Sequence, residues 1–143
     1  MTDVRRLEIK QWLNRAFHAN NKAKALARFA EQCRENAQGT SINYEGNDAG
    51  KSGSSENGTE KAYIKLAEAE EKARQQKQEC ERLILEIQNV ISTLHDDELE
   101  AVLINRYLNF MSVERTAEFM HYDSRTVMRK VNKAIEKLSP NVT

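Results

Sequence analysis

The chain has 143 residues, enough for one or two small domains and too few for a large multidomain enzyme. Its 22 basic and 22 acidic residues cancel, so the whole chain has no net attraction for nucleic acid or for an anionic membrane. No apolar run reaches the ~20 residues that span a bilayer, and no secretion signal follows the N-terminus, so we expect a cytoplasmic protein that does not bind membranes.

Two long helices are predicted, over residues 1–38 and 60–94, because apolar side chains recur there at alternating steps of three and four residues. In the first helix these positions are Ile9, Trp12, Ala16, Ala19, Ala23, Leu26, Ala30, Cys33 and Ala37. In the second they are Leu66, Ala69, Ala73, Gln76, Cys80, Leu83, Ile87, Val90 and Leu94, and Gln76 is the polar exception. Such a narrow apolar seam is typical of a coiled coil, so each helix needs a partner along one face.

Residues 39–59 separate the two helices and contain all five glycines of the chain. This composition predicts a flexible Gly/Ser-rich linker. A linker of this length allows the two helices to fold back on each other as an antiparallel hairpin. The same seams are compatible with an intermolecular coiled coil, and the sequence leaves both arrangements open.

A third region, residues 95–139, is predicted to form a module of three shorter helices. Asp96 precedes an acidic first turn, Ser112 precedes a short helix over 112–120, and Asp123 or Ser124 caps a last helix that reaches about Leu138. The expected fold is therefore all-α, with a long helical hairpin followed by this three-helix module.

The last two helices have the spacing of a helix-turn-helix. This motif needs a small residue in its first helix, a tight turn, and a branched apolar residue that fixes the crossing angle of the second helix. Ala117, His121 and Val127 occupy these three positions, and His121 stands where the backbone is expected to be left-handed. Residues 124–138 carry five basic residues against one acidic residue, so the predicted second helix is strongly basic.

This register predicts a DNA-binding face, because Arg can donate two hydrogen bonds to guanine and Asn can pair with adenine. The candidate base-reading residues are Ser124, Arg125, Met128, Arg129 and Asn132. The candidate phosphate contacts, which fix register rather than sequence, are Ser112, Arg115, Thr126, Lys130 and Lys133. The competing interpretation is a basic, solvated face on an ordinary three-helix bundle.

An enzymatic function is not indicated. The three histidines are scattered, and Cys33 and Cys80 are neither clustered nor joined by His at metal-ligand spacing. We therefore expect no catalytic residues, no metal and no cofactor, and we expect both cysteines to be reduced thiols on the seams.

Residues 94–138 resemble region four of bacterial sigma factors. The matching residues are Leu94, Val102, Leu103, Arg106, Tyr107, Ser112, Ala117, Val127 and the closing run 134–138. The whole chain is similar to small phage and prophage regulators of Gram-positive bacteria, which also have an N-terminal helix like Trp12-Leu13-Asn14-Arg15. Three positions depart from the sigma pattern: His121 replaces Gly, Thr116 replaces an apolar residue, and Arg115 replaces an acidic one.

The resemblance implies a sequence-specific DNA-binding transcriptional regulator in a bacterial host cell, a late-gene activator that works with host RNA polymerase on double-stranded promoter or operator DNA. A homodimer would place two basic helices on two half-sites. The alternative is a coiled-coil adaptor that binds RNA polymerase or another regulator without reading DNA. We do not expect a sigma factor acting alone, because residues 1–95 lack the aromatic cluster that captures unpaired bases.

Overall fold

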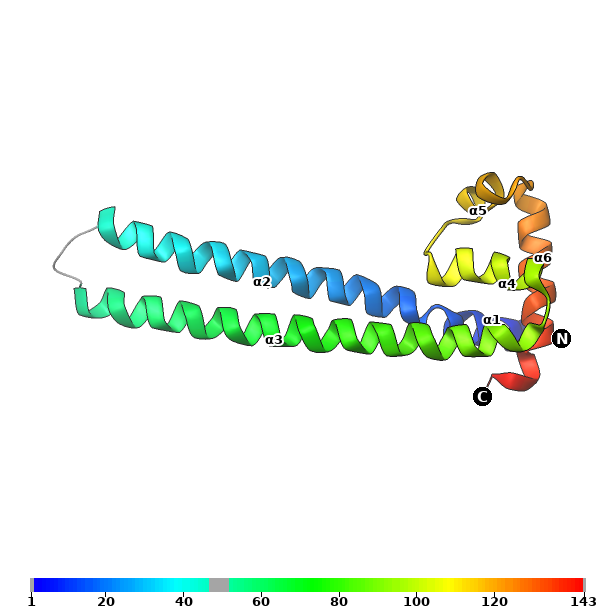
Figure 1. Cartoon of the computed structure of the whole chain (residues 1–143), viewed down its shortest axis with the longest axis horizontal. Coiled ribbons are helices and arrows are strands. Elements are labelled where there is room, and N and C mark those ends of the chain that lie inside the picture. Colours follow the sequence, from blue (N-terminus) through cyan, green and yellow to red (C-terminus); the bar gives the residue numbers. More distant parts are fainter. Residues whose placement is uncertain (1, 47–51, 143) are drawn as a thin grey trace. The chain divides into compact units, whose positions relative to one another are not determined.

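The computed structural model of the chain describes residues 2–46 and 52–142, and every element in these ranges is helical (Figure 1). This confirms the predicted all-α fold class. The elements are α1 (Asp3–Leu13), α2 (Arg15–Gly46), α3 (Ser52–Ile91), η2 (Ser92–Leu94), α4 (Asp97–Leu103), η3 (Ile104–Leu108), α5 (Val113–Met120), α6 (Ser124–Leu138) and η4 (Ser139–Asn141). None of the described helices combines the length and the apolar character needed to cross a membrane.

The helices extend further into the predicted linker than its composition indicated. α2 continues to Gly46 and α3 starts at Ser52, so residues 47–51, which lie outside the described part of the chain, are all that remains between them. Once a helix is nucleated, each added residue gains a backbone hydrogen bond, so a long helix can extend into residues of weak helix propensity. The flexibility of residues 39–59 stays a prediction.

The chain divides into two compact units. Residues 20–79 form one unit, here called the hairpin unit, and residues 1–19 together with 80–143 form the other, here called the terminal unit. The sequence pattern grouped residues 1–38 together, but the division falls inside α2, and α1 belongs to the same unit as the three shorter helices.

In the hairpin unit, α2 and α3 lie side by side and run in opposite directions (Figure 1). Their seams meet in a buried cluster of Ala30, Cys33, Leu66 and Ala69. Beside this cluster Arg34 forms an ion pair with Glu70, which joins the two helices. The seams are therefore satisfied within one chain, as expected for the hairpin arrangement.

The periodicity predicted the buried positions correctly in both units. Every residue of the two predicted seams is buried or half-buried, including the polar Gln76. Both cysteines are free and buried on these seams, as expected. Burial also raises the pKa of the Cys80 thiol, because the thiolate is poorly solvated there.

The core of the terminal unit joins residues from both ends of the chain. Four helices, α1, α3, α4 and α6, provide its large fully buried apolar side chains: Ile9, Leu13, Ile87, Ile91, Val102, Leu103, Val127, Ile135 and Leu138. Burying one such side chain stabilises a fold by roughly 1.5–3 kcal/mol. Because α1 provides two of them, it is an integral part of this core.

Candidate nucleic-acid interface

Side-chain caps fix where the three shorter helices begin. The Oδ1 atom of Asp96 accepts a hydrogen bond from the backbone N–H of Leu99 at 3.1 Å, at the start of α4. The next two helices are capped in the same way, by a side chain that accepts a hydrogen bond from the backbone N–H three residues later. Ser112 caps α5 and Asp123 caps α6. These bonds satisfy donors that the first turn of a helix leaves free. The pKa of Asp123 is lowered, chiefly because its carboxylate accepts the backbone N–H of Thr126.

A tight turn connects α5 to α6. His121 ends α5 in the left-handed conformation, with φ 60° and ψ 42°. The N–H of Tyr122 donates to the carbonyl of Ala117 at 2.8 Å, the bond that commonly closes a helix at such a residue. Ala117 and Val127 are both buried at the crossing of the two helices.

Thr116, which stands where the resemblance has an apolar residue, is fully buried. Its hydroxyl donates to the carbonyl of Ser112 at 2.8 Å, so the threonine adds no unpaired donor to the core. The threonine at this position therefore does not disturb the packing of α5.

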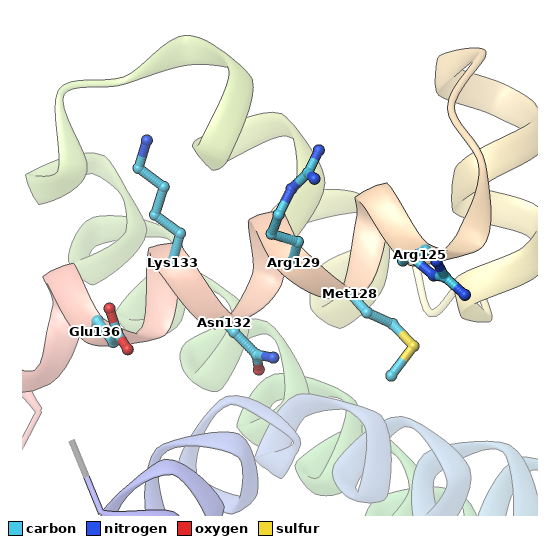
Figure 2. Close-up of a pocket in the computed structure, with 6 residues that line it drawn as sticks. All are labelled: Arg125, Met128, Arg129, Asn132, Lys133 and Glu136. Carbon is cyan, nitrogen blue, oxygen red and sulfur yellow. The ribbon is translucent and has the colours of Figure 1, made fainter.

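One face of α6 is buried and the other is open. Its inner face packs against α4, α5 and α1. Its outer face carries a shallow depression whose lining, seen in Figure 2, consists of Arg125, Met128, Arg129, Asn132, Lys133 and Glu136. The structure thus brings together Lys133 and four of the five candidate base-reading residues, while the fifth, Ser124, is half-buried at the first position of α6.

The basic side chains of this outer face are open to solvent. Arg125, Arg129 and Lys133 are exposed, and none of them has a hydrogen bond or an ion pair with any residue that the structure describes. Met128 belongs to the same lining, and 55% of its surface is exposed. The outer face of α6 therefore offers guanidinium and ammonium donors, and an apolar group, to a partner outside the chain.

The other candidate phosphate contacts do not lie in this depression. Arg115 lines a separate depression that includes Phe119 and His121. The hydroxyl of Ser112 is occupied as the cap of α5, and Thr126 is half-buried in the first turn of α6.

Lys130 is paired within the molecule. Its Nζ atom lies 2.6 Å from Oε1 of Glu98 on α4 and 5.3 Å from the ring centre of Tyr122. The Tyr122 hydroxyl also donates to Glu98, and these two hydrogen bonds hold the pKa of that carboxyl below its ordinary value. The pKa of Lys130 is correspondingly raised. In this arrangement Lys130 connects α6 to α4 and is not presented to a phosphate.

Asn132 differs from the other residues of the depression. Its Oδ1 atom is buried and has no hydrogen-bond partner in the described part of the chain. Arg129 and Lys133 point to one side of α6, whereas Met128 and Asn132 point to the other, toward α1 (Figure 2). A two-bond contact with adenine would need this oxygen to be accessible. The sequence indicated the face on which Asn132 lies, but not that α1 borders it.

The described chain is all-helical, with long paired helices followed by several shorter ones. It belongs to the family described as "Protein of unknown function (DUF1492)", whose model matches residues 46–139. The match covers α3 to α6 and leaves α1 outside. No curated protein and no solved structure matches the chain.

Proposed function

We propose that this protein is a sequence-specific DNA-binding transcriptional regulator that inserts α6 into the major groove. The observation that carries the proposal is the outer face of α6, where Arg125, Arg129 and Lys133 are exposed and make no hydrogen bond or ion pair with a described residue. By contrast, Lys130 of the same helix is paired within the molecule, with Glu98 of α4.

The roles within this face follow from the chemistry of the side chains. Arg125 and Arg129 are suited to donating two hydrogen bonds each to a guanine edge, and Met128 to apolar contact with a thymine methyl group. Lys133 is suited to a phosphate. The α5–turn–α6 geometry supports the proposal, since a helix-turn-helix holds its second helix at a fixed angle for this purpose.

The resemblance of residues 94–138 to sigma region four supports a more specific proposal. On this proposal the protein activates phage or prophage late genes in the cytoplasm of a bacterial host, bound to promoter or operator DNA beside host RNA polymerase. It acts as a homodimer. Exposed apolar side chains on the hairpin unit support a protein contact there: Phe29, Tyr63 and Ile64.

A second candidate function is an adaptor that binds RNA polymerase or another regulator without reading DNA. The observation that favours it is Phe119 on α5, whose side chain is 65% exposed in a depression shared with Arg115 and Glu118. A large exposed aromatic flanked by charges suits a protein surface better than a phosphate backbone.

Selection of bound duplexes from a random-sequence library, followed by affinity measurements on the selected site, separates the two candidates. For a DNA reader, Arg125→Ala or Arg129→Ala should each cost about 1–3 kcal/mol on the selected site and relax its sequence preference. Lys133→Ala should weaken selected and random duplexes equally. Failure of the wild-type protein to enrich any sequence, with no salt-dependent binding, would favour the adaptor.

A matched control is Arg82→Ala. It removes one positive charge from the same unit, on α3, where Arg82 pairs with Glu86 of the same helix. This variant should bind the selected site like the wild type. Equal losses in all four variants would mean that total charge, rather than the face of α6, determines binding.

A further inference from the structure

We propose that α1 is a second element of the DNA interface and that Lys10 contacts a phosphate beside the C-terminal half of α6. This inference rests on the proposed function and extends it to a helix outside the residues that the family match covers. It comes from what surrounds α1 in the terminal unit.

Several contacts fix α1 against the end of α6. Ile9 and Leu13 are fully buried in the shared core. Nη2 of Arg5 donates to the carbonyl of Ser139 at 2.8 Å and to that of Val142 at 2.5 Å, directly after α6. Because both apolar and polar contacts hold it, α1 has a defined position relative to the outer face of α6.

Lys10 lies at the border between the two helices. It lines a small pocket of about 110 Å³ together with residues of α6 and the neighbouring elements, namely Arg106, Tyr107, Val113, Met128, Val131 and Asn132. The Lys10 side chain is half-buried, and its ammonium has no hydrogen bond or ion pair with any described residue. A lysine in this setting packs its aliphatic stem on apolar neighbours and directs its charge to solvent.

The same pocket contains the unpaired oxygen of Asn132. A buried polar atom without a partner costs roughly 1–3 kcal/mol, so such atoms are uncommon in a protein interior. A phosphate oxygen can accept a hydrogen bond from the Lys10 ammonium, whereas the Asn132 oxygen can pair only with a donor.

α1 also changes the charge of the outer face. Glu136 is the acidic member of the residues that line the depression on α6 and would repel a phosphate. Nη2 of Arg6 lies 3.6 Å from Oε1 of Glu136 and partly neutralises it. With Lys10 added beside Asn132, α1 makes the C-terminal half of the face more positive than the sequence of α6 alone does.

The position of α1 determines which part of DNA it would meet. The major groove is about 12 Å wide, and a helix with its side chains has a diameter of about 10–12 Å, so α6 alone fills the groove. A helix packed alongside it, on the Met128 and Asn132 side, must face the sugar-phosphate strand that borders the groove. Lys10 is therefore assigned to a phosphate and not to a base.

The test measures how the affinity for a short random-sequence duplex depends on salt, which requires no knowledge of the operator. Each lost phosphate contact should reduce the slope of log affinity against log salt by about 0.9. Between about 50 and 200 mM salt, the wild type should therefore lose about 3.5-fold more affinity than Lys10→Ala. Lys10→Arg should restore the wild-type slope, and Arg82→Ala should leave it unchanged.

The outcomes distinguish this inference from the proposed function. If the wild type shows no salt-dependent binding to the duplex, the proposed function fails and the inference fails with it. If the wild type binds and Lys10→Ala has the slope of the wild type, the Lys10 contact alone is refuted. If Lys10→Ala changes the sequence preference but leaves the salt slope unchanged, the phosphate assignment is also refuted. Lys10 would then influence base reading by way of Asn132 and would not contact a phosphate. Circular dichroism and the fluorescence of Trp12 verify that each variant is folded.

Discussion

At the scale of single residues, the sequence predicted conformations and packing positions better than it predicted partners. His121 has the left-handed backbone that the spacing from Ala117 to Val127 demands. Lys130 and Asn132 lie on the expected helix, but one is paired with Glu98 of α4 and the other has its amide oxygen buried beside α1. Spacing along one helix identifies the helix face of a side chain, whereas its partner depends on how distant segments pack.

The cluster of Glu98, Tyr122 and Lys130 predicts how stability depends on pH. The folded-state pKa of Glu98 lies below its ordinary value of 4.5, first because Lys130 and then because Tyr122 donates to it. A carboxyl with a lowered pKa stabilises the fold above that ordinary value, and this stabilisation disappears as the pH falls through the folded-state pKa. Glu98→Gln should therefore lower the Tm at neutral pH, and the gap to the wild type should close below about pH 4.5.

Thermal unfolding followed by the fluorescence of Trp12, the single tryptophan of the chain, reports on the terminal unit that contains this cluster. The control is Glu81→Gln, which removes an exposed carboxylate from α3. A gap between Glu98→Gln and the wild type that stays constant across the acid range would show that the ion pair does not contribute to stability.

At the scale of elements, the strongest signals in the sequence were periodicity and caps, and these were confirmed. The alternating steps of three and four residues identified both seams. Asp96 and Ser112 cap the helices they were expected to cap, and of the two candidates Asp123 and Ser124 it is Asp123 that caps α6. The assignment of α1 to the terminal unit was missed. The first helix has one continuous apolar pattern, and nothing in that pattern indicates where its partner changes.

The docking of α1 predicts a large difference between two leucines of the same helix. Leu13 is fully buried in the core of the terminal unit, whereas Leu7 is 56% exposed. Leu13→Ala should destabilise this unit by about 2–5 kcal/mol, because it removes apolar contacts and leaves a cavity. Leu7→Ala should change the stability by at most about 0.5 kcal/mol. Denaturant unfolding followed by Trp12 fluorescence measures both, and equal effects would mean that α1 is not part of this core.

At the scale of the whole molecule, the sequence predicted the fold class and the face of α6 that carries unpaired basic residues. It did not indicate that α1 borders that face, because long-range docking leaves no local pattern of spacing. The part of the candidate interface on α6 can therefore be predicted from the sequence of one helix. The part on α1 depends on the two ends of the chain packing in one unit.

The aromatic residues of the chain bear on whether the protein could open a promoter by itself. Opening a promoter requires clustered aromatic and basic side chains that hold unpaired bases. Residues 1–95 contain five widely spaced aromatic residues, namely Trp12, Phe17, Phe29, Tyr44 and Tyr63. Two of these already have partners in the terminal unit: Arg15 stacks over Trp12 at 4.5 Å, and Phe17 meets Phe110 edge-to-face at 5.9 Å. The protein should therefore depend on a host sigma factor rather than replace one.

In transcription from a target promoter with purified components, transcripts should require both this protein and polymerase that carries sigma. Specific transcripts from core polymerase and this protein alone would overturn that expectation, and Arg129→Ala provides the matched loss-of-binding control.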